Sequence, residues 1–167
     1  KIAIIEGDEY LSSPIDRRPK FHLYKPNIAV ISGIAWDHIN VFPTFENYVE
    51  QFNIFAKSID ENGSLIYCQE DSELKKMVNS NSFSCELTPY KTHDHVIIEN
   101  KTYLKENDTH HKIDIFGNHN LQNLKAAQIV CEKIGVKSSE FYSSIADFKG
   151  ASKRMELVVK NDHFSFF

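Results

Sequence analysis

Apolar runs alternate with amphipathic segments over the first half of the chain. Three runs are short, rich in β-branched residues and almost wholly apolar, as expected of strands covered on both faces: residues 1–5, 28–34 and 64–68. Residues 44–59 carry apolar side chains at helical i, i+3, i+4 spacing, with Thr44 as the expected N-cap and Asn62-Gly63 as the expected end. Residues 72–78 predict a second, short helix. This order favours an α/β fold, a mostly parallel sheet flanked by helices.

Between about residues 83 and 116 the pattern changes to short, partly alternating segments. Three of them predict strands: 96–99, 101–104 and 112–116. Asn100 and Asn107-Asp108 supply turn chemistry, so we expect a small antiparallel sheet attached to the main one. Four histidines lie here on polar, turn-rich sequence, where we expect exposed loops and not metal ligands: His93, His95, His110 and His111.

The last part of the chain begins at Gly117, which permits a tight turn from strand to helix. Helical periodicity follows from Leu121 to Ile134, and Gly135 is the expected end of that helix. A further helix is predicted near residues 139–148. A terminal pair of strands follows: residues 157–160 and 163–167.

Polar side chains gather in the first turn of the helix after Gly117: His119, Asn120 and Asn123. Asparagine side chains and first-turn amide groups can bind an adenine edge or a phosphate. Ordinary N-capping explains one asparagine equally well, but it does not explain the whole set.

Length and composition narrow the class of protein. The chain has 167 residues, a net charge of -4, 41% hydrophobic and 25% charged residues, which is typical of one globular domain with a core. The negative charge argues against a nucleic-acid or anionic-membrane surface as the main role. No apolar run approaches the roughly 18–20 residues that span a bilayer. Three scattered cysteines without CxxC spacing indicate neither a zinc knuckle nor a disulfide framework, so we expect a reduced, cytoplasmic location.

Carboxylates and a histidine follow directly on two of the predicted buried strands. Glu6-Gly7-Asp8-Glu9 comes after the first, and Asp37-His38 after the second. Ligands bind at the carboxyl ends of strands in an open α/β sheet, so we expect Asp37 and His38 to form a metal site or an acid/base pair. The acidic cluster repels itself unless a cation or basic groups lie among it, and we expect the two segments to converge on a divalent cation. A solvated acidic loop and a turn-capping Asp37 are the alternatives. Residues 16–22 are the most basic stretch, which can bind phosphate or carboxylate or can simply be solvated.

Four motifs occur in order along nearly the whole chain: Glu6-Gly7-Asp8-Glu9, Asp37-His38, Gly117-x-His119-Asn120-x-x-Asn123-x-x-Ala126-Ala127 and Phe148-x-Gly150-x-x-Lys153-Arg154-x-Glu156. Each is unspecific alone. The ordered set resembles the central ATP-binding domain of the Mur ligase family, whose members join an amino acid or peptide to a UDP-sugar carboxylate in bacterial cell-wall synthesis.

The resemblance implies ATP and Mg²⁺ as cofactors and assigns roles by position. Glu6 and His38 match the family's magnesium ligands. A carboxylate suits this hard cation, whereas histidine is a less usual ligand for it. The family's nucleotide contacts correspond to His119, Asn120, Asn123 and Arg154.

Within the family, the basic stretch is similar to one branch. That branch joins UDP-N-acetylmuramate to the murein tripeptide L-alanyl-γ-D-glutamyl-meso-diaminopimelate in peptidoglycan recycling. The similarity rests on Glu9-Tyr10, residues 16–26 and Phe42-Pro43, and it makes Arg17 and Lys20 the candidate substrate contacts. The L-alanine-adding branch, a folylpolyglutamate synthase relative and a non-catalytic nucleotide-binding domain are alternatives. A metal hydrolase is another, with its own set of ligands: Glu6, Asp8, Asp37 and His38.

Apolar segments are cut at both ends, so we expect a piece of a longer protein. The family's Gly-Lys-Thr/Ser phosphate loop would lie upstream of Lys1, together with a UDP-binding domain, and a C-terminal domain would bind the amine. Residues 1–154 are then the central domain without its first strand, and residues 155–167 the hinge and first strand of the next domain. We expect this fragment alone to be inactive.

Overall fold

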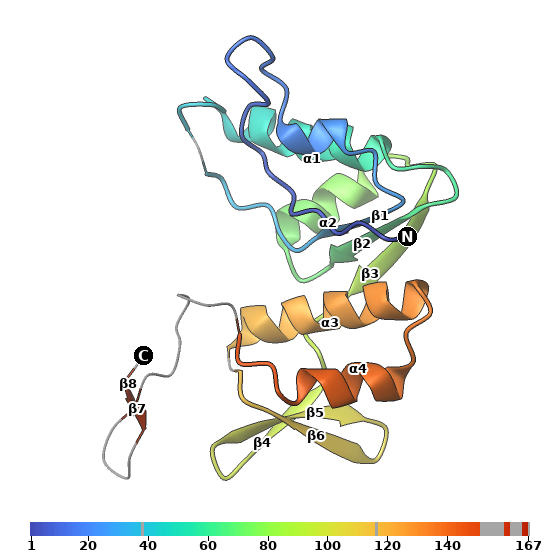
Figure 1. Ribbon diagram of the computed structural model, residues 1–167. Helices are drawn as coiled ribbons and strands as arrows, with labels where there is room; N and C mark the ends of the chain where they lie inside the picture. Colours follow the sequence, from blue (N-terminus) through green and yellow to red (C-terminus); the bar gives the residue numbers. More distant parts are fainter. Residues whose placement is uncertain (38, 116, 151–158, 161–164, 167) are drawn as a thin grey trace. The chain divides into compact units, whose positions relative to one another are not determined.

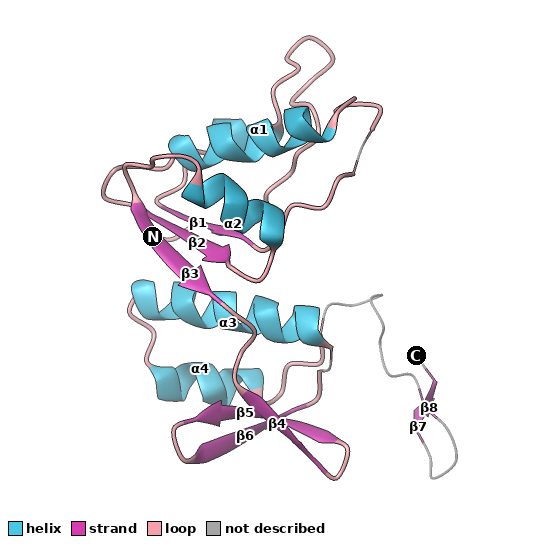
Figure 2. Cartoon of the chain, turned by 180° about the vertical axis from the view of Figure 1, so that it is seen from behind, coloured by secondary structure: helices cyan, strands magenta, loops and turns pink. Residues whose placement is uncertain are grey.

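The computed structural model describes residues 1–37, 39–115, 117–150, 159–160 and 165–166 (Figure 1). The chain forms two compact units, Lys1–Lys91 (unit 1) and Thr92–Phe167 (unit 2). Each unit has its own three-stranded sheet and its own pair of α-helices, and unit 2 also includes a separate two-stranded pair (Figure 2).

A parallel sheet forms the centre of unit 1. Its strands pair in the order β1 (Ile28–Ile31), β2 (Ser64–Cys68) and β3 (Glu86–Tyr90). α1 (Phe45–Lys57) connects β1 to β2, and α2 (Ser72–Asn79) connects β2 to β3. Both helices lie on one face of the sheet (Figures 1 and 2), as right-handed crossovers between neighbouring parallel strands require. Every residue of β2 is buried, as expected of the middle strand.

The first predicted helix is confirmed, with one boundary corrected. α1 begins where Thr44 Oγ1 accepts a hydrogen bond from the backbone N–H of Asn47 at 3.1 Å. It ends at Lys57, so the expected end at Asn62-Gly63 is wrong. The backbone N–H of Ser58 already satisfies carbonyls of the last turn, and the helix needs no glycine there.

Gly63 instead lies where the strands of unit 1 begin. The backbone N–H of Ser64 bonds to the carbonyl of Asn27 at 2.9 Å, and the carbonyl of Gly63 accepts from Glu86 at 3.0 Å. A Cβ on residue 63 would stand 2.4 Å from the carbonyl oxygen of Asn27. The close approach of two backbone segments therefore requires glycine at this position.

Two predictions about the edges of this sheet are wrong. Residues 1–5 form no strand, and Ile4 is 92% exposed. An apolar run becomes a buried strand only where a neighbour takes its backbone hydrogen bonds, and no described strand pairs with this one. Conversely, β3 was not predicted. It is an edge strand in which Pro89 and the exposed Leu87 interrupt the expected pattern.

The predicted antiparallel sheet is confirmed in unit 2. Its strands pair in the order β4 (His95–Ile98), β5 (Lys101–Glu106) and β6 (Thr109–Ile113). The β4–β5 turn has positive φ at Glu99 (49°) and Asn100 (59°), and the β5–β6 turn has it at Asn107 (52°). Asparagine tolerates this left-handed region, so the expected turn chemistry is present in both connections.

Two helices pack on one face of the antiparallel sheet (Figures 1 and 2): α3 (Asn118–Lys133) and α4 (Ser138–Ile145). The core between them contains Leu104, Ile113, Ile115, Leu121, Leu124, Phe141 and Tyr142. Gly135, at φ 89°, ends α3 as predicted. The backbone N–H of Val136 bonds to the carbonyl of Cys131 at 2.9 Å, which is the Schellman pattern of helix termination.

β7 (Val159–Lys160) and β8 (Ser165–Phe166) form an antiparallel pair within the two predicted terminal strands. The remaining positions of those segments lie outside the described residues. Among the helices that the structure describes, none combines the length and apolar character needed to cross a membrane.

Candidate functional site

The acidic loop after residue 5 is only partly held by the rest of unit 1. Glu6 is exposed, whereas Asp8 is bonded at three atoms. Its Oδ2 accepts from Lys20 Nζ at 2.7 Å, its Oδ1 from the backbone of Tyr10 at 2.8 Å, and its carbonyl from the backbone of Phe21 at 3.0 Å. Lys20 thus supplies a positive charge to the carboxylate cluster, and the hydrogen bond with Asp8 raises the pKa of Lys20.

Carboxylates from both predicted acidic segments lie near one buried hydroxyl. Tyr48 on α1 is 4% exposed and packs against Phe42, with 5.2 Å between the ring centroids. Burial raises the pKa of Tyr48 to about 12, and the negative charges of Glu9 and Asp37 contribute to this rise. Negative charges of the acidic loop and of the loop after β1 therefore both act on the Tyr48 hydroxyl.

The basic stretch belongs to a hairpin. The backbone of Lys20 bonds to Tyr10 at 2.9 Å, and that of Ser12 bonds to Arg18 at 2.8 Å. Leu11 and Pro19 form a β-bridge between the two arms. We refer to residues 8–21 as the basic hairpin.

The two arginines at the tip of the basic hairpin differ in whether they are paired with a carboxylate. The guanidinium of Arg18 donates two hydrogen bonds to Asp16, at 3.0 and 2.7 Å, and they lower the pKa of Asp16 to about 2. Arg17 is exposed, and no hydrogen bond or ion pair joins it to another described residue. Of the two predicted substrate contacts, Lys20 is therefore paired with Asp8, and Arg17 is the cation that the tip presents.

The first turn of α3 carries the predicted nucleotide contacts. His119 and Asn123 are exposed, and Asn120 is half-buried. Gly117, at φ 91°, turns the chain into the helix, and the His119 ring lies back over it, with Cε1 3.2 Å from the position of a Cβ. His119 and Asn123 share a helix face at i, i+4 spacing. Their imidazole and amide groups can donate and accept hydrogen bonds along the edge of a base.

Two predicted site residues, His38 and Arg154, lie outside the described residues. Of the predicted magnesium ligands, the structure describes Glu6, whose exposed carboxylate is the hard oxygen donor that magnesium prefers. Over the described part of the chain, no group of three or more His, Cys, Asp or Glu side chains is placed to hold a metal ion. Glu6 and the α3 turn belong to different units, and their roles stay predictions.

Sequence reasoning missed a buried polar network in unit 2. His93, expected in an exposed loop, is 2% exposed, so that expectation is wrong. Its Nε2 lies 3.0 Å from the hydroxyl of Tyr142, and this hydroxyl accepts from Gln128 Nε2 at 3.3 Å. Gln128 is the residue from which the sequence could have predicted this network. It continues the apolar stripe of α3 from Leu124, and a buried amide needs a buried hydrogen-bond partner.

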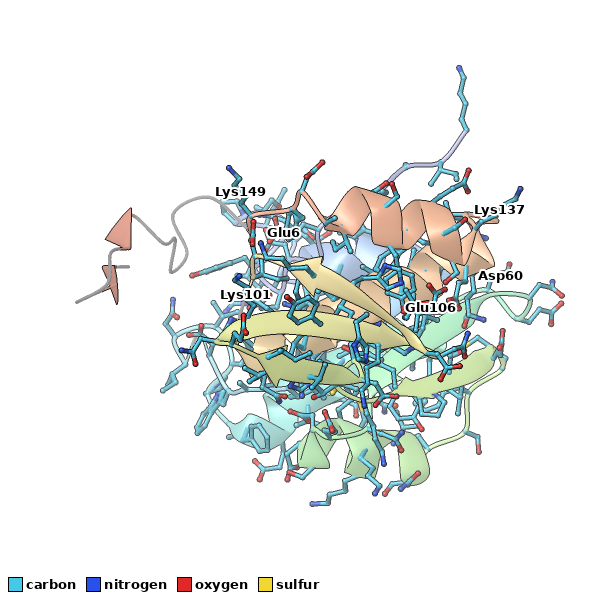
Figure 3. All side chains as sticks on the ribbon, turned by 90° about the horizontal axis from the view of Figure 1, so that it is seen from below. Glu6, Asp60, Lys101, Glu106, Lys137 and Lys149 are labelled. Carbon is cyan, nitrogen blue, oxygen red and sulfur yellow. The ribbon has the colours of Figure 1, made fainter. Side chains whose placement is uncertain are left out.

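The network continues toward the β5–β6 turn. The His111 ring stacks on Tyr142 at 4.2 Å, and its Nε2 lies 2.9 Å from Glu106 Oε2. Figure 3 shows Glu106 near the start of α4, where the Ser138 hydroxyl donates to its other oxygen. The hydrogen bond from Ser138 and the neighbouring His111 lower the pKa of Glu106.

Known proteins share both the sequence and the fold. Residues 1–131 match the Mur ligase middle domain. The UDP-N-acetylmuramate–L-alanine ligase of Caldicellulosiruptor bescii is 30% identical over 167 residues, covering 93% of this chain and 35% of that protein. The chain spans about a third of the length of the curated relatives that it matches.

Two solved structures illustrate the similarity. The UDP-N-acetylmuramate:L-alanyl-γ-D-glutamyl-meso-diaminopimelate ligase of Neisseria meningitidis gives a TM-score of 0.75 at 20% identity, over 89% of this chain and 48% of that chain. The MurF ligase of Thermotoga maritima, solved in complex with ADP, gives 0.64 at 19% identity, over 82% and 34%. These structures confirm the predicted α/β fold with its small antiparallel sheet. The match to the Mur ligase middle domain over residues 1–131 shows that this chain belongs to the Mur ligase family.

Proposed function

We propose that the full-length protein is an ATP-dependent amide ligase that joins UDP-N-acetylmuramate to L-alanyl-γ-D-glutamyl-meso-diaminopimelate. Membership of the Mur ligase family supports the reaction class, and the relatives from Caldicellulosiruptor bescii and Neisseria meningitidis are both named as ligases of UDP-N-acetylmuramate. The present residues would form most of the ATP-binding domain.

The proposed reaction has two steps. An oxygen of the muramoyl carboxylate attacks the γ-phosphorus of ATP, ADP leaves, and an acyl phosphate forms. The acceptor amine then attacks the acyl carbon and loses a proton, and phosphate leaves as the amide bond forms. Magnesium, when bound, neutralises charge on the transferred phosphoryl group.

Each predicted residue has a defined task in this scheme. Glu6 and His38 would hold the magnesium ion. The exposed face of the first α3 turn would hydrogen-bond the adenine, which agrees with the exposure of His119 and Asn123 and the half-burial of Asn120. Arg154 would contact the nucleotide from the hinge.

The choice of acceptor is supported by the basic hairpin. The tripeptide carries several carboxylates, whereas L-alanine carries one, and a guanidinium pairs well with a carboxylate. Arg17 is exposed on a hairpin whose other two cations, Arg18 and Lys20, are paired with Asp16 and Asp8. L-Alanine is the second candidate acceptor, because the curated relative from Caldicellulosiruptor bescii is named as the L-alanine ligase.

An acceptor assay separates the two candidates. Full-length protein is incubated with ATP, magnesium, UDP-N-acetylmuramate and either tripeptide or L-alanine, and both phosphate release and the ligated product are measured. We expect tripeptide to be ligated with the higher kcat/KM. A preference for L-alanine would overturn the choice of acceptor. If no ATP-dependent product forms with either acceptor, the ligase proposal itself is overturned.

Arg17 gives a sharper test of the hairpin. We expect Arg17→Ala to raise KM for the tripeptide about tenfold, because one charge-assisted hydrogen bond is lost, and to leave kcat nearly unchanged. Lys101→Ala on β5 removes the same charge elsewhere on the surface (Figure 3) and is the matched control. Equal KM values for the two variants would remove Arg17 from the substrate site.

A further inference from the structure

Three segments of unit 2 meet at the buried His93: the loop before β4, α3 and α4. The His93 Nδ1–H donates to the carbonyl of Asp94 at 2.8 Å, and Nε2 accepts from the Tyr142 hydroxyl at 3.0 Å. On α3, Gln128 donates to the same hydroxyl at 3.3 Å, and its Oε1 accepts from Lys125 Nζ at 3.0 Å.

These hydrogen bonds run in one direction. Lys125 can only donate, so it fixes the Gln128 carbonyl oxygen as its acceptor and leaves the Gln128 amide N–H to donate to the Tyr142 hydroxyl, which then gives its own proton to His93. That requires a neutral imidazole with its proton on Nδ1. A second proton on Nε2 would place two donors face to face and leave the Tyr142 proton without an acceptor.

The same loop is bonded to the first turn of α3. Thr92 Oγ1 donates to Asn118 Oδ1 at 3.0 Å, and the backbone N–H of His93 bonds to the carbonyl of Leu121 at 3.4 Å. Asn118 and Leu121 flank His119 and Asn120 in the chain. The loop that His93 fixes from inside therefore also holds the turn that carries the predicted adenine contacts.

We propose that His93 is a positioning residue, which fixes the first turn of α3 for nucleotide binding through the hydrogen bond that it accepts from Tyr142. This inference rests on the proposed function, because it takes the α3 turn as the adenine site. Protonation of His93 breaks the directional chain of hydrogen bonds, so the affinity for ATP falls in acid.

The surroundings of His93 favour its neutral form near pH 7. Burial lowers the pKa of His93, Lys125 lowers it further, and the bond to the Asp94 carbonyl acts against both. Other charged or titratable groups face this network from the neighbouring elements: Asp94 and His95 beside the loop, His111 and Glu106 from the sheet, Tyr142 from α4, and Glu132 and Lys125 from α3. We thus expect His93 to become protonated only at a pH below 6.5, the ordinary pKa of histidine.

Two variants and a control test the proposal in the full-length protein. Tyr142→Phe removes the donor to His93, whereas His93→Gln keeps an acceptor that does not protonate. Tyr103→Phe removes a hydroxyl from β5 of the same unit and is the control, since no described hydrogen bond uses it. ATP affinity is measured by calorimetry from about pH 8 to about pH 5, across the histidine range. Hydrogen exchange of residues 118–123 is followed over the same range.

Wild-type affinity should fall on acidification below 6.5. Tyr142→Phe should bind ATP about tenfold more weakly at neutral pH, because a buried acceptor loses its partner, and its exchange in the turn should rise. His93→Gln should keep affinity near that of the wild type but lose the pH dependence. Tyr103→Phe should match the wild type.

Several results would overturn the inference. The inference fails if Tyr142→Phe keeps the ATP affinity and the hydrogen exchange of the wild type. It also fails if His93→Gln keeps the wild-type pH dependence of ATP affinity. Absence of ATP binding by the wild type would instead contradict the proposed function. In that case the exchange data decide alone: unchanged protection of residues 118–123 in acid and in both variants refutes positioning by His93.

Discussion

The two units bury different chemistry. Among the described residues of unit 1, the buried side chains that always stay polar and uncharged are Asn53 and Ser64, and the buried tyrosines include Tyr48, whose pKa of about 12 lies above the physiological range. The core around them includes Leu65 and Ile66 at 0% exposure. In the described part of unit 2, the buried polar side chains His93 and Gln128 belong to one hydrogen-bonded network with Tyr142. The stability of an apolar core does not depend on pH. A buried histidine can gain a charge within the physiological pH range, and the free-energy cost of burying it then rises. The comparison predicts that packing governs the stability of unit 1 and that pH adjusts the stability of unit 2.

The largest expected effect is in the apolar core of unit 1. Leu65→Ala should lower the free energy of unfolding by about 3 kcal/mol, because it leaves a cavity in the fully buried middle strand. Denaturant unfolding followed by the fluorescence of Trp36, the single tryptophan of the chain, reports on this unit. Leu23→Ala, at a side chain 46% exposed, is the control and should cost far less. Similar losses in the two variants would contradict the description of this core.

Asp71 should give the second effect. Its Oδ1 accepts from the backbone of Leu74 at 2.7 Å and caps α2, and its Oδ2 accepts from the backbone of Ile34 at 3.3 Å. Asp71→Ala should therefore cost about 2 kcal/mol of unfolding free energy. Thr44→Ala removes a cap with one such bond from α1 and should cost about 1 kcal/mol. A loss at Asp71 no larger than that at Thr44 would show that the bond to Ile34 adds nothing.

A smaller, pH-dependent effect is expected in unit 2. The pKa of His93 is lowered in the folded state, so the unfolded chain binds the extra proton first as pH falls below 6.5. Stability then decreases toward acid, by at most about 1.4 kcal/mol per pH unit, and it is fully retained above that window. Hydrogen exchange of α3 and α4 at a series of pH values measures this change. His93→Gln should show a flatter profile, and an equally steep one would assign the effect to another group.

The smallest effect is expected at an exposed ion pair of the same unit. Lys112 and Asp114 lie 3.2 Å apart, with both side chains more than half exposed. Asp114→Asn should change the free energy of unfolding by less than about 0.5 kcal/mol, and added salt should remove the difference. A larger loss would place surface charge, beside the buried histidine, among the determinants of stability in unit 2.

Elements with strong local signals were predictable from the sequence. β2, α1 and the turns at Asn100 and Asn107 follow from periodicity, an N-cap and asparagine turn chemistry. β3 was not predictable in the same way, because Pro89 and an exposed Leu87 give an edge strand no clear pattern. Residues 1–5 show the opposite failure: their pattern is that of a strand, but strand formation depends on a pairing partner and not on pattern alone.

The candidate site divides along similar lines. The turn into α3 could be expected from Gly117 and the helical periodicity after it, whereas Glu6 was expected at the end of a strand that residues 1–5 do not form. The pairing of Lys20 with Asp8 could not be expected, because it depends on how the basic hairpin folds back. The burial of His93 also escaped prediction, since its polar neighbours in sequence differ from its neighbours in space, Tyr142 and Gln128.

Gly63 limits how this half of the molecule can vary. The connection between α1 and β2 can change in length and composition only upstream of that glycine, because the space beside it is already filled by the carbonyl oxygen of Asn27. A bulkier residue would displace the shared origin of all three parallel strands, and the loops at their opposite ends would move with them. The geometry of the loop after β1, which carries Asp37, thus depends on a residue without a side chain at the far end of the sheet.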